Sequence, residues 1–196
     1  MKKWMTKTKS KIETLKIEAK ANKVPIICDE GLAFLISVIK EYNIRNVLEI
    51  GAAVGFSAIN MAQYVDFVDT FERDEKMCEE LYKNIRSFEL EKKITVYPYD
   101  ALEYEGELRE YGLIFIDAAK AQYEKFFIKY SPYLSSDGII VCDNLNFHNL
   151  KEDEVGRQTR QLLRKIKAFK EFLANNKEYQ TKIFDIGDGM SISKKL

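Results

Sequence analysis

The stretch at residues 46–63, NVLEIGAAVGFSAINMAQ, predicts a buried strand, a tight turn and a helix in immediate succession. Within it, Glu49, Gly51 and Gly55 give the spacing E-x-G-x-x-x-G. The two glycines let the backbone approach a ligand where a Cβ atom would collide, and the acid supplies an acceptor at the strand end. This pattern is typical of turns that bind a nucleotide cofactor, but strand–turn–helix connections use such glycines for structural reasons as well. The stretch alone leaves both interpretations open.

The alternation of strand and helix continues along the chain. Apolar runs predict strands at residues 46–50, 67–71, 94–99, 112–116, 138–142, 179–186 and 190–195. Helices are predicted over 2–21, 30–42, 74–89, 101–111, 121–134 and 157–175, the second of them capped by Asp29, and a turn is predicted at 135–138. The GDG sequence at 187–189 predicts a closing antiparallel hairpin. We therefore predict one α/β domain over residues 1–196, Rossmann-like, with a seven-stranded and mostly parallel sheet.

Chain length and residue usage exclude several classes of protein. A chain of 196 residues is long enough for one domain with a full core. No apolar run approaches the roughly 20 residues of a membrane span, and no apolar segment follows the basic N-terminus as in a secretory signal. The three cysteines, Cys28, Cys78 and Cys142, are far apart and odd in number. They predict reduced thiols in a cytoplasmic protein without a membrane partner.

Positive charge is concentrated in two segments although the net charge is zero. Residues 1–23, the predicted N-terminal helix, contain eight lysines and two glutamates, a balance of +6. Residues 156–170 contain six basic side chains and no acid, again +6, so the remaining chain carries −12. Each basic segment is either a solvated helix face or a surface for an anionic partner such as nucleic acid.

Five successive predicted strands deliver an acidic residue at or near their carboxyl ends: Glu49, Glu72, Asp100, Asp117 and Asp143. In a parallel sheet these ends share one edge, and ligands bind in the crevice there. Five acids at one edge would repel each other unless a cation or a hydroxyl-rich ligand lay between them. The pattern therefore favours a binding site.

Two of these acids have positions typical of a nucleoside site. Glu72 lies about 20 residues beyond the glycine turn, where an acid reaches ribose hydroxyls. Asp100 and Ala101 end the third strand, where the edge of an adenine would lie.

A second group of residues predicts a metal site at the same edge. Asp117, Asp143 and Asn144 are oxygen donors with no histidine or cysteine ligand set beside them, and such hard ligands suit Mg²⁺. Lys120 lies three residues after Asp117 and is a candidate general base, although a surface lysine at a helix start is the alternative.

Together the motifs resemble those of the cation-dependent O-methyltransferases, the family that includes catechol and caffeoyl-CoA O-methyltransferases. The motifs are E-x-G-x-x-x-G, Glu72, FIDAAK and CDN, in that order. The segments VPII, FIDAAKAQYEKFF, YLSSDG, CDNLNF and YQTKIFDIGDGMSISKK are most similar to the bacterial tRNA 5-hydroxyuridine methyltransferases. The resemblance implies a class I methyltransferase domain that is often dimeric.

The resemblance also implies roles for individual residues. It implies metal ligation by Asp117, Asp143 and Asn144, with Lys120 as the base and Asp117 beside it in the catalytic machinery. It implies S-adenosylmethionine contacts, which with Gly55 of the turn give the set Ile27, Glu49, Gly51, Gly55, Ser57, Glu72, Asp100, Ala101 and Asp117. Two departures matter. The segment after the fifth strand, residues 145–156, is short, which argues against a CoA-thioester substrate. The N-terminal segment is also brief, so the contacts that the family makes there are assigned to no residue of this chain.

The leading hypothesis is Mg²⁺-dependent O-methylation of 5-hydroxyuridine at the tRNA wobble position by a cytoplasmic homodimer. Both 5-hydroxyuridine and a catechol offer two adjacent oxygens to a cation, so a small-molecule catechol-type methyltransferase is the alternative. Tyr123, Phe147 and His148 are candidates for stacking on a target base, with core packing or loop surface as the favoured alternative for each. A nicotinamide-dependent oxidoreductase would need G-x-G-x-x-G, which GAAVG lacks. A non-catalytic RNA-binding domain is disfavoured by the complete set of polar site residues.

Overall fold

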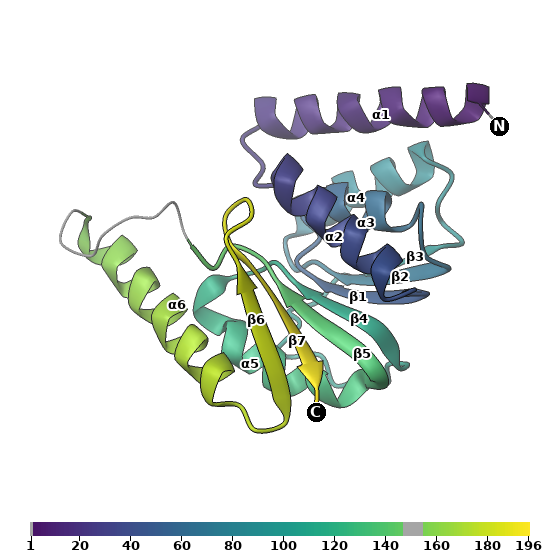
Figure 1. The fold of residues 1–196 in the computed structure, drawn as a ribbon. Coiled ribbons are helices and arrows are strands. Elements are labelled where there is room, and N and C mark those ends of the chain that lie inside the picture. Colours follow the sequence, from purple (N-terminus) through teal and green to yellow (C-terminus); the bar gives the residue numbers. More distant parts are fainter. Residues whose placement is uncertain (1, 147–154) are drawn as a thin grey trace.

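A seven-stranded sheet forms the centre of the computed structural model, which describes residues 2–146 and 155–196 (Figure 1). The strand order is β3-β2-β1-β4-β5-β7-β6. Strands β1 to β5 are parallel, and β7 pairs antiparallel with both β5 and β6. The strands are β1 (Asn46–Ile50), β2 (Phe67–Phe71), β3 (Ile94–Tyr97), β4 (Tyr111–Ile116), β5 (Leu134–Cys142), β6 (Tyr179–Phe184) and β7 (Met190–Lys195). The predicted parallel sheet with an antiparallel closing hairpin is confirmed.

Successive side chains of each strand point to opposite faces of the sheet, so each face carries an apolar core, and helices cover both. Val47 of β1 points into the core beneath α1 (Lys2–Ala21), α2 (Asp29–Glu41), α3 (Phe56–Met61) and α4 (Glu75–Ser87). Leu48 points into the opposite core, beneath α5 (Tyr123–Tyr130) and α6 (Arg157–Asn175). Two short 3-10 turns, η1 (Lys120–Gln122) and η2 (Ser131–Tyr133), flank α5. Among the described residues, no helix combines the length and apolar character that crossing a bilayer would require.

The N-terminal helix α1 lies on the outer side of the first helical layer, at the top of Figure 1. Leu15 and Ala19 bury its inner side. The ammonium group of Lys16 lies 2.7 Å from the carboxylate of Asp29 at the start of α2. Lys11 places its ammonium group 5.7 Å from the centre of the Phe88 ring. These contacts join the basic N-terminal segment to the domain.

Three local predictions were wrong. Cys28, not Asp29, caps α2, because its Sγ accepts the amide of Gly31 (3.4 Å) while Asp29 is already helical. The turn predicted at 135–138 lies inside β5, which begins at Leu134 and carries a bulge where its pairing with β4 shifts. The predicted third strand also ends two residues early, at Tyr97.

The helix predicted over 101–111 does not form beyond a single turn after Asp100. Its carbonyl groups are bound by side chains of α5 instead of by amides four residues along. The Tyr130 hydroxyl donates to the carbonyl of Ala101 (2.6 Å), and Lys129 donates to those of Leu102 (2.6 Å) and Tyr104 (2.7 Å). Tertiary hydrogen bonds therefore replace the helical ladder in this segment.

Candidate functional site

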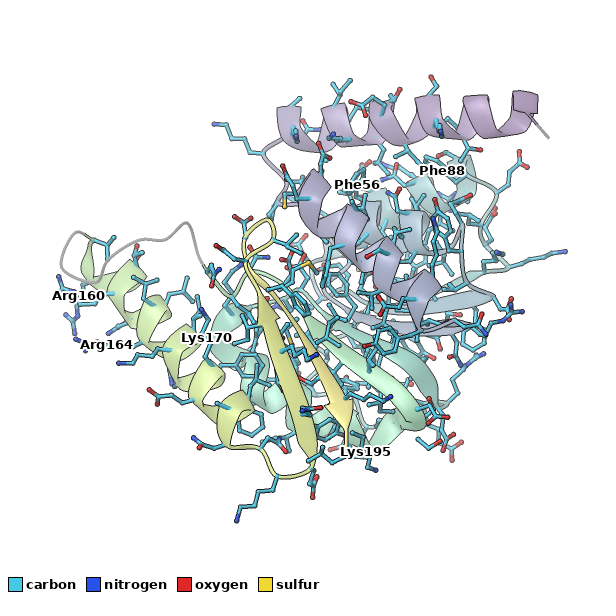
Figure 2. The ribbon with its side chains drawn as sticks, viewed as in Figure 1. Phe56, Phe88, Arg160, Arg164, Lys170 and Lys195 are labelled. Carbon is cyan, nitrogen blue, oxygen red and sulfur yellow. The ribbon has the colours of Figure 1, made fainter. Side chains whose placement is uncertain are left out.

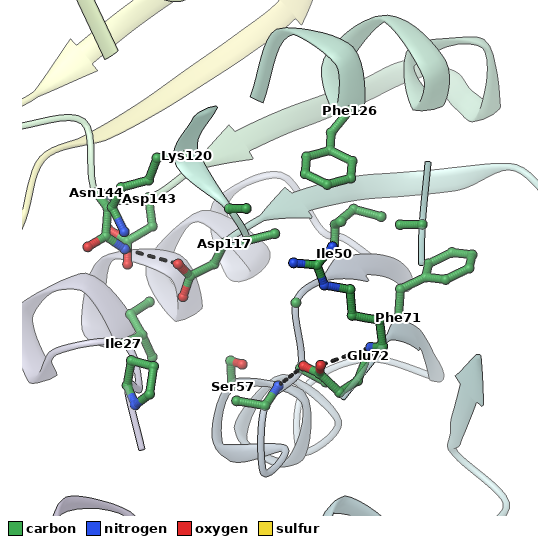
Figure 3. A pocket seen from close by; sticks show the side chains of 18 of the residues that line it. Ile27, Ile50, Ser57, Phe71, Glu72, Asp117, Lys120, Phe126, Asp143 and Asn144 are labelled. Carbon is green, nitrogen blue, oxygen red and sulfur yellow. Dashed lines mark hydrogen bonds between the residues drawn. The ribbon is translucent and has the colours of Figure 1, made fainter. Parts of the chain in front are cut away.

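One cavity of about 480 Å³ lies along the carboxyl ends of the parallel strands (Figure 3). It is formed by the residues that follow β1, β2, β3, β4 and β5, together with the segment before α2. Ten of the sequence-predicted site residues line it: Ile27, Gly51, Ser57, Glu72, Asp100, Ala101, Asp117, Lys120, Asp143 and Asn144. Glu49 and Gly55 do not line it. The sheet edge therefore brings most of the predicted set into one space.

The turn after β1 has the tight geometry that its glycines predict. Gly51 has φ +102°, and a Cβ atom there would lie 2.2 Å from the carbonyl oxygen of Asp117. Gly55 has φ +87°, and its Cβ would lie 2.4 Å from the Leu81 side chain. The Gly51 amide donates to the carbonyl of Phe71 (3.0 Å). Glycine at position 51 is thus required for the close approach of the β1 and β4 ends.

Glu49 lies one residue before the end of β1 and does not line the cavity, unlike the other four acids predicted at this edge of the sheet. Its carboxylate is fully buried and accepts hydrogen bonds from Ser57 Oγ and Thr70 Oγ1, both at 2.5 Å. Burial raises the pKa of Glu49 to about 7, against the two hydrogen bonds and with a smaller contribution from the charge of Asp117. Glu49 therefore holds Ser57, which lines the cavity, from behind.

Glu72 and Asp100 present carboxylates whose positions are set by the backbone. Glu72 accepts the amides of Ala53, Arg73 and Asp74, each at 2.8 Å, so it joins the glycine turn to the end of β2. Asp100 accepts the Leu102 amide (2.9 Å) and Arg73 Nη1 (2.8 Å). The Leu102 hydrogen bond, followed by that of Arg73, lowers the pKa of Asp100 despite its partial burial. Both are rigid acceptors suited to the hydroxyl or amino groups of a nucleoside.

Asp117, Asp143, Asn144 and Lys120 gather at the other end of the cavity, as Figure 3 shows. Asn144, with φ +62°, donates its side-chain amide to Asp117 Oδ1 (3.0 Å), and its backbone amide donates to Asp143 Oδ1 (2.7 Å). Burial raises the pKa of Asp143 to about 7, and the charge of Asp117 adds to this rise. Burial also raises the pKa of Asp117, while Lys120 opposes the shift. For both acids, burial outweighs the hydrogen bonds from Asn144 and the charge of Lys120, which favour the charged carboxylate.

The chemistry of this donor set fits a hard divalent cation. Asp117 and Asp143 supply carboxylate oxygens and Asn144 an amide oxygen, the ligand types that Mg²⁺ prefers. A cation between the two acids would also favour their charged forms, which burial disfavours. Within residues 2–146 and 155–196, no three His, Cys, Asp or Glu side chains cluster closely enough to form a metal site by themselves. The Asn144 oxygen and water would therefore have to complete the coordination.

The cavity contains residues that the sequence did not single out. Phe71, Phe126 and the half-exposed Tyr99 provide its apolar and aromatic surface. Asp188, from the turn between β6 and β7, lies near Asp117 and Asp143, at the candidate metal end of the cavity. Asp188 is the central residue of the GDG sequence. A hairpin turn accounts for that sequence by itself, so the sequence did not indicate a ligand-binding role for Asp188.

Of the three predicted base-stacking residues, one is buried in the core and two lie outside the described residues. Tyr123 is 1% exposed and packs edge-on against Phe169 (5.5 Å between ring centres), so its prediction as a stacking residue was wrong. Phe147 and His148 lie outside the residues that the structure describes. The predicted basic helix at 157–175 is confirmed as α6.

Comparison with known proteins identifies the family. Residues 6–196 match the family model described as O-methyltransferase. Tapetum-specific methyltransferase 1 of Arabidopsis thaliana is 29% identical over 88% of this chain and 78% of its own length, and a caffeoyl-CoA O-methyltransferase of Populus kitakamiensis is 25% identical over the same shares. The crystal structure of a candidate caffeoyl-CoA O-methyltransferase from Staphylococcus aureus superposes with a TM-score of 0.89 and 34% identity, covering 94% of this chain and 92% of that one. The chain therefore belongs to the O-methyltransferase family.

Proposed function

We propose that this protein transfers the methyl group of S-adenosylmethionine to the 5-hydroxyl of 5-hydroxyuridine at the wobble position of tRNA, with Mg²⁺ as its cation. Family membership and the cavity at the strand edge support the O-methyl transfer. The outer face of α6 supports the choice of RNA. The resemblance of segments such as FIDAAKAQYEKFF to the 5-hydroxyuridine branch agrees with this choice.

The residues divide the proposed chemistry between the two ends of the cavity. When bound, S-adenosylmethionine supplies the methyl group and the cation lowers the pKa of the acceptor hydroxyl. Glu72 and Asp100 hold the nucleoside part of the donor through their fixed carboxylates. Asp117, Asp143 and Asn144 would hold the cation, which would help to orient the acceptor hydroxyl toward the methyl group. Lys120, which lines the same space, takes the hydroxyl proton on its ε-amino group.

The α6 helix carries a basic outer face beside this end of the cavity. Ile166, Phe169 and Leu173 bury its inner side. Its basic residues Arg157, Arg164, Lys165 and Lys167 are exposed. Figure 2 shows Arg160 and Arg164 pointing away from the sheet, whereas Lys170 lies on the inner side and donates to Asn146 Oδ1 (2.8 Å), two residues after Asn144. A helix tied to the metal end and basic on its outside suits a polyanion.

A small-molecule catechol-type methyltransferase is the second candidate. The cavity of about 480 Å³ is of the size used for small ligands, and the plant relatives include a caffeoyl-CoA O-methyltransferase. This reading needs no basic surface. Sensitivity of activity to salt and to α6 charge separates the two candidates.

The decisive experiment offers both acceptors to the same protein. Purified protein is incubated with S-adenosylmethionine, Mg²⁺ and either tRNA containing 5-hydroxyuridine or a free catechol, and 5-methoxyuridine is measured by mass spectrometry after digestion. We expect 5-methoxyuridine, its loss with EDTA, and its recovery with added Mg²⁺. The variant Asp143→Ala is expected to lose activity while Asp137→Ala, an exposed acid outside the cavity, keeps it. Methylation of the catechol alone would contradict the tRNA substrate, and activity in EDTA would contradict the cation.

We also propose that the protein acts as a homodimer in the cytoplasm, where its tRNA substrate would be found. The resemblance to a family that is often dimeric supports the oligomeric state. Light scattering on the purified protein tests it, and a monomer at assay concentration would contradict it.

A further inference from the structure

Asp188 occupies the turn of the β6–β7 hairpin, and this turn is joined to the segment that follows Asn144. The Leu145 amide donates to the carbonyl of Gly189 (2.8 Å), and the Asn146 amide donates to the carbonyl of Asp188 (2.7 Å). Asn146 also donates its side-chain amide to Asp185 Oδ1 (2.7 Å). These hydrogen bonds therefore join the hairpin turn to the two residues that follow the proposed ligand Asn144.

The glycines on either side hold Asp188 in place. Gly187 has φ +56°, and a Cβ atom there would lie 2.4 Å from Cys28 Sγ. Gly189 has φ +85°, and its Cβ would lie 2.7 Å from the backbone nitrogen of Asn146. Close packing on both sides fixes the turn against α2 and the β5 end, and Asp188 lines the cavity from it.

Asp188 adds a third negative charge to the metal end of the cavity. Its charge contributes to the raised pKa of both Asp117 and Asp143, although burial is the main cause for each. Asp117, Asp143 and Asp188 therefore place three carboxyl groups at this end of the cavity, and a divalent cation between them would offset their mutual repulsion. Since the described residues contain no cluster of three acids able to bind a metal directly, Asp188 lies beyond direct coordination.

We propose that Asp188 holds the hydrated cation from outside its direct ligands, by accepting hydrogen bonds from water that the cation retains. Mg²⁺ usually keeps several waters when bound to protein, which gives an outer carboxylate something to bind. Outer groups of this kind change metal affinity by about 10- to 100-fold. This role rests on the proposed cation-dependent function but not on the identity of the acceptor.

The test measures cation binding without any methyl acceptor. Mn²⁺ is titrated into protein saturated with S-adenosylhomocysteine, free Mn²⁺ is followed by electron paramagnetic resonance, and Mg²⁺ is then added as competitor. Asp188→Asn is expected to weaken Mn²⁺ binding about 10- to 100-fold. Glu178→Gln, at the opposite end of β6, is the matched control and is expected to bind like the wild type. Affinity for S-adenosylhomocysteine and the melting temperature are measured on each variant to check the fold.

Each outcome supports or overturns the role of Asp188. Unchanged Mn²⁺ affinity in a folded Asp188→Asn variant overturns it, as does wild-type protein that binds no Mn²⁺. Should Asp188→Asn fail to fold, Asp188→Glu and Asp188→Gln are compared, and equal affinity in these two overturns it because the charge then has no effect. Suppose that Asp188→Asn binds Mn²⁺ more weakly than the wild type, and that the wild type does not methylate tRNA. That combination would contradict the tRNA substrate and leave the role of Asp188 intact.

Discussion

At the scale of single residues, Gly51 and Gly55 share a left-handed backbone but differ in what surrounds them. Gly51→Ala places a Cβ against the backbone carbonyl of Asp117, whereas Gly55→Ala meets only the end of the Leu81 side chain, which can rotate. We expect Gly51→Ala to cost more than about 2 kcal/mol of folding free energy and to abolish cofactor binding. Gly55→Ala should cost about 1–2 kcal/mol and keep it. Urea unfolding and calorimetry with S-adenosylhomocysteine measure both effects, and equal losses would contradict the assigned role of Gly51.

The buried Glu49 predicts a pH dependence of stability. Its folded pKa of about 7 lies above its ordinary value of 4.5, so the folded protein keeps a proton that the unfolded chain has lost. Stability from this group is fully present below pH 4.5 and is lost as the pH rises through 7. Glu49→Gln should therefore gain stability relative to the wild type between pH 5 and pH 8, by up to about 3 kcal/mol. Urea unfolding at both pH values checks this, with the exposed Glu41→Gln as control. A difference in unfolding free energy between Glu49→Gln and the wild type that is the same at pH 5 and pH 8 would contradict the raised pKa of Glu49.

At the scale of elements, α5 builds the nucleoside end of the cavity by fixing the segment at 101–110. The variant Tyr130→Phe removes the hydrogen bond to the Ala101 carbonyl and leaves the apolar packing of the ring intact. We expect a loss of about 1 kcal/mol in stability and weaker binding of the cofactor, because Asp100 and Ala101 lose their support. Tyr133→Phe on η2, whose hydroxyl makes no such bond in the described residues, is the control. Cofactor affinity that stays at the wild-type level would show that Asp100 is held without α5.

At the scale of the whole molecule, zero net charge conceals a separation into basic segments and an acidic remainder. If the exposed basic side chains of α6 each contact a phosphate, log(kcat/KM) for tRNA should fall with log[salt] with a slope of about −3, from roughly −0.7 for each of four contacts. The double variant R164E/K167E should flatten this slope and leave activity on a free catechol or nucleoside unchanged. E171K on the same helix is the opposite control and should not weaken tRNA use. A salt response equal for tRNA and free nucleoside would contradict the proposed surface.

The polar residues of the site could be predicted from the sequence because strand ends are local features. An apolar run followed by an acid marks the position of Glu72, Asp117 or Asp143 without knowledge of the rest of the chain. Parallel strands then bring such residues to one edge whatever their separation in sequence. The same reasoning placed Glu49 at this edge, but Glu49 lies one residue inside its strand and binds Ser57 and Thr70 behind the cavity wall.

The alternation of strands and helices, the glycine turn and the acids near the sheet edge can all be predicted from the amino-acid sequence. These follow from side-chain periodicity and from backbone conformations that only glycine adopts easily. Only the tertiary structure decided the conformation of residues 101–110, where Lys129 and Tyr130 bind the carbonyls that a helix would have used. It alone brought Asp188 opposite Asp117 and Asp143, because the hairpin turn meets the β5 end through packing between distant segments. Such contacts depend on how whole helices and strands pack against each other. A local sequence pattern does not contain that information.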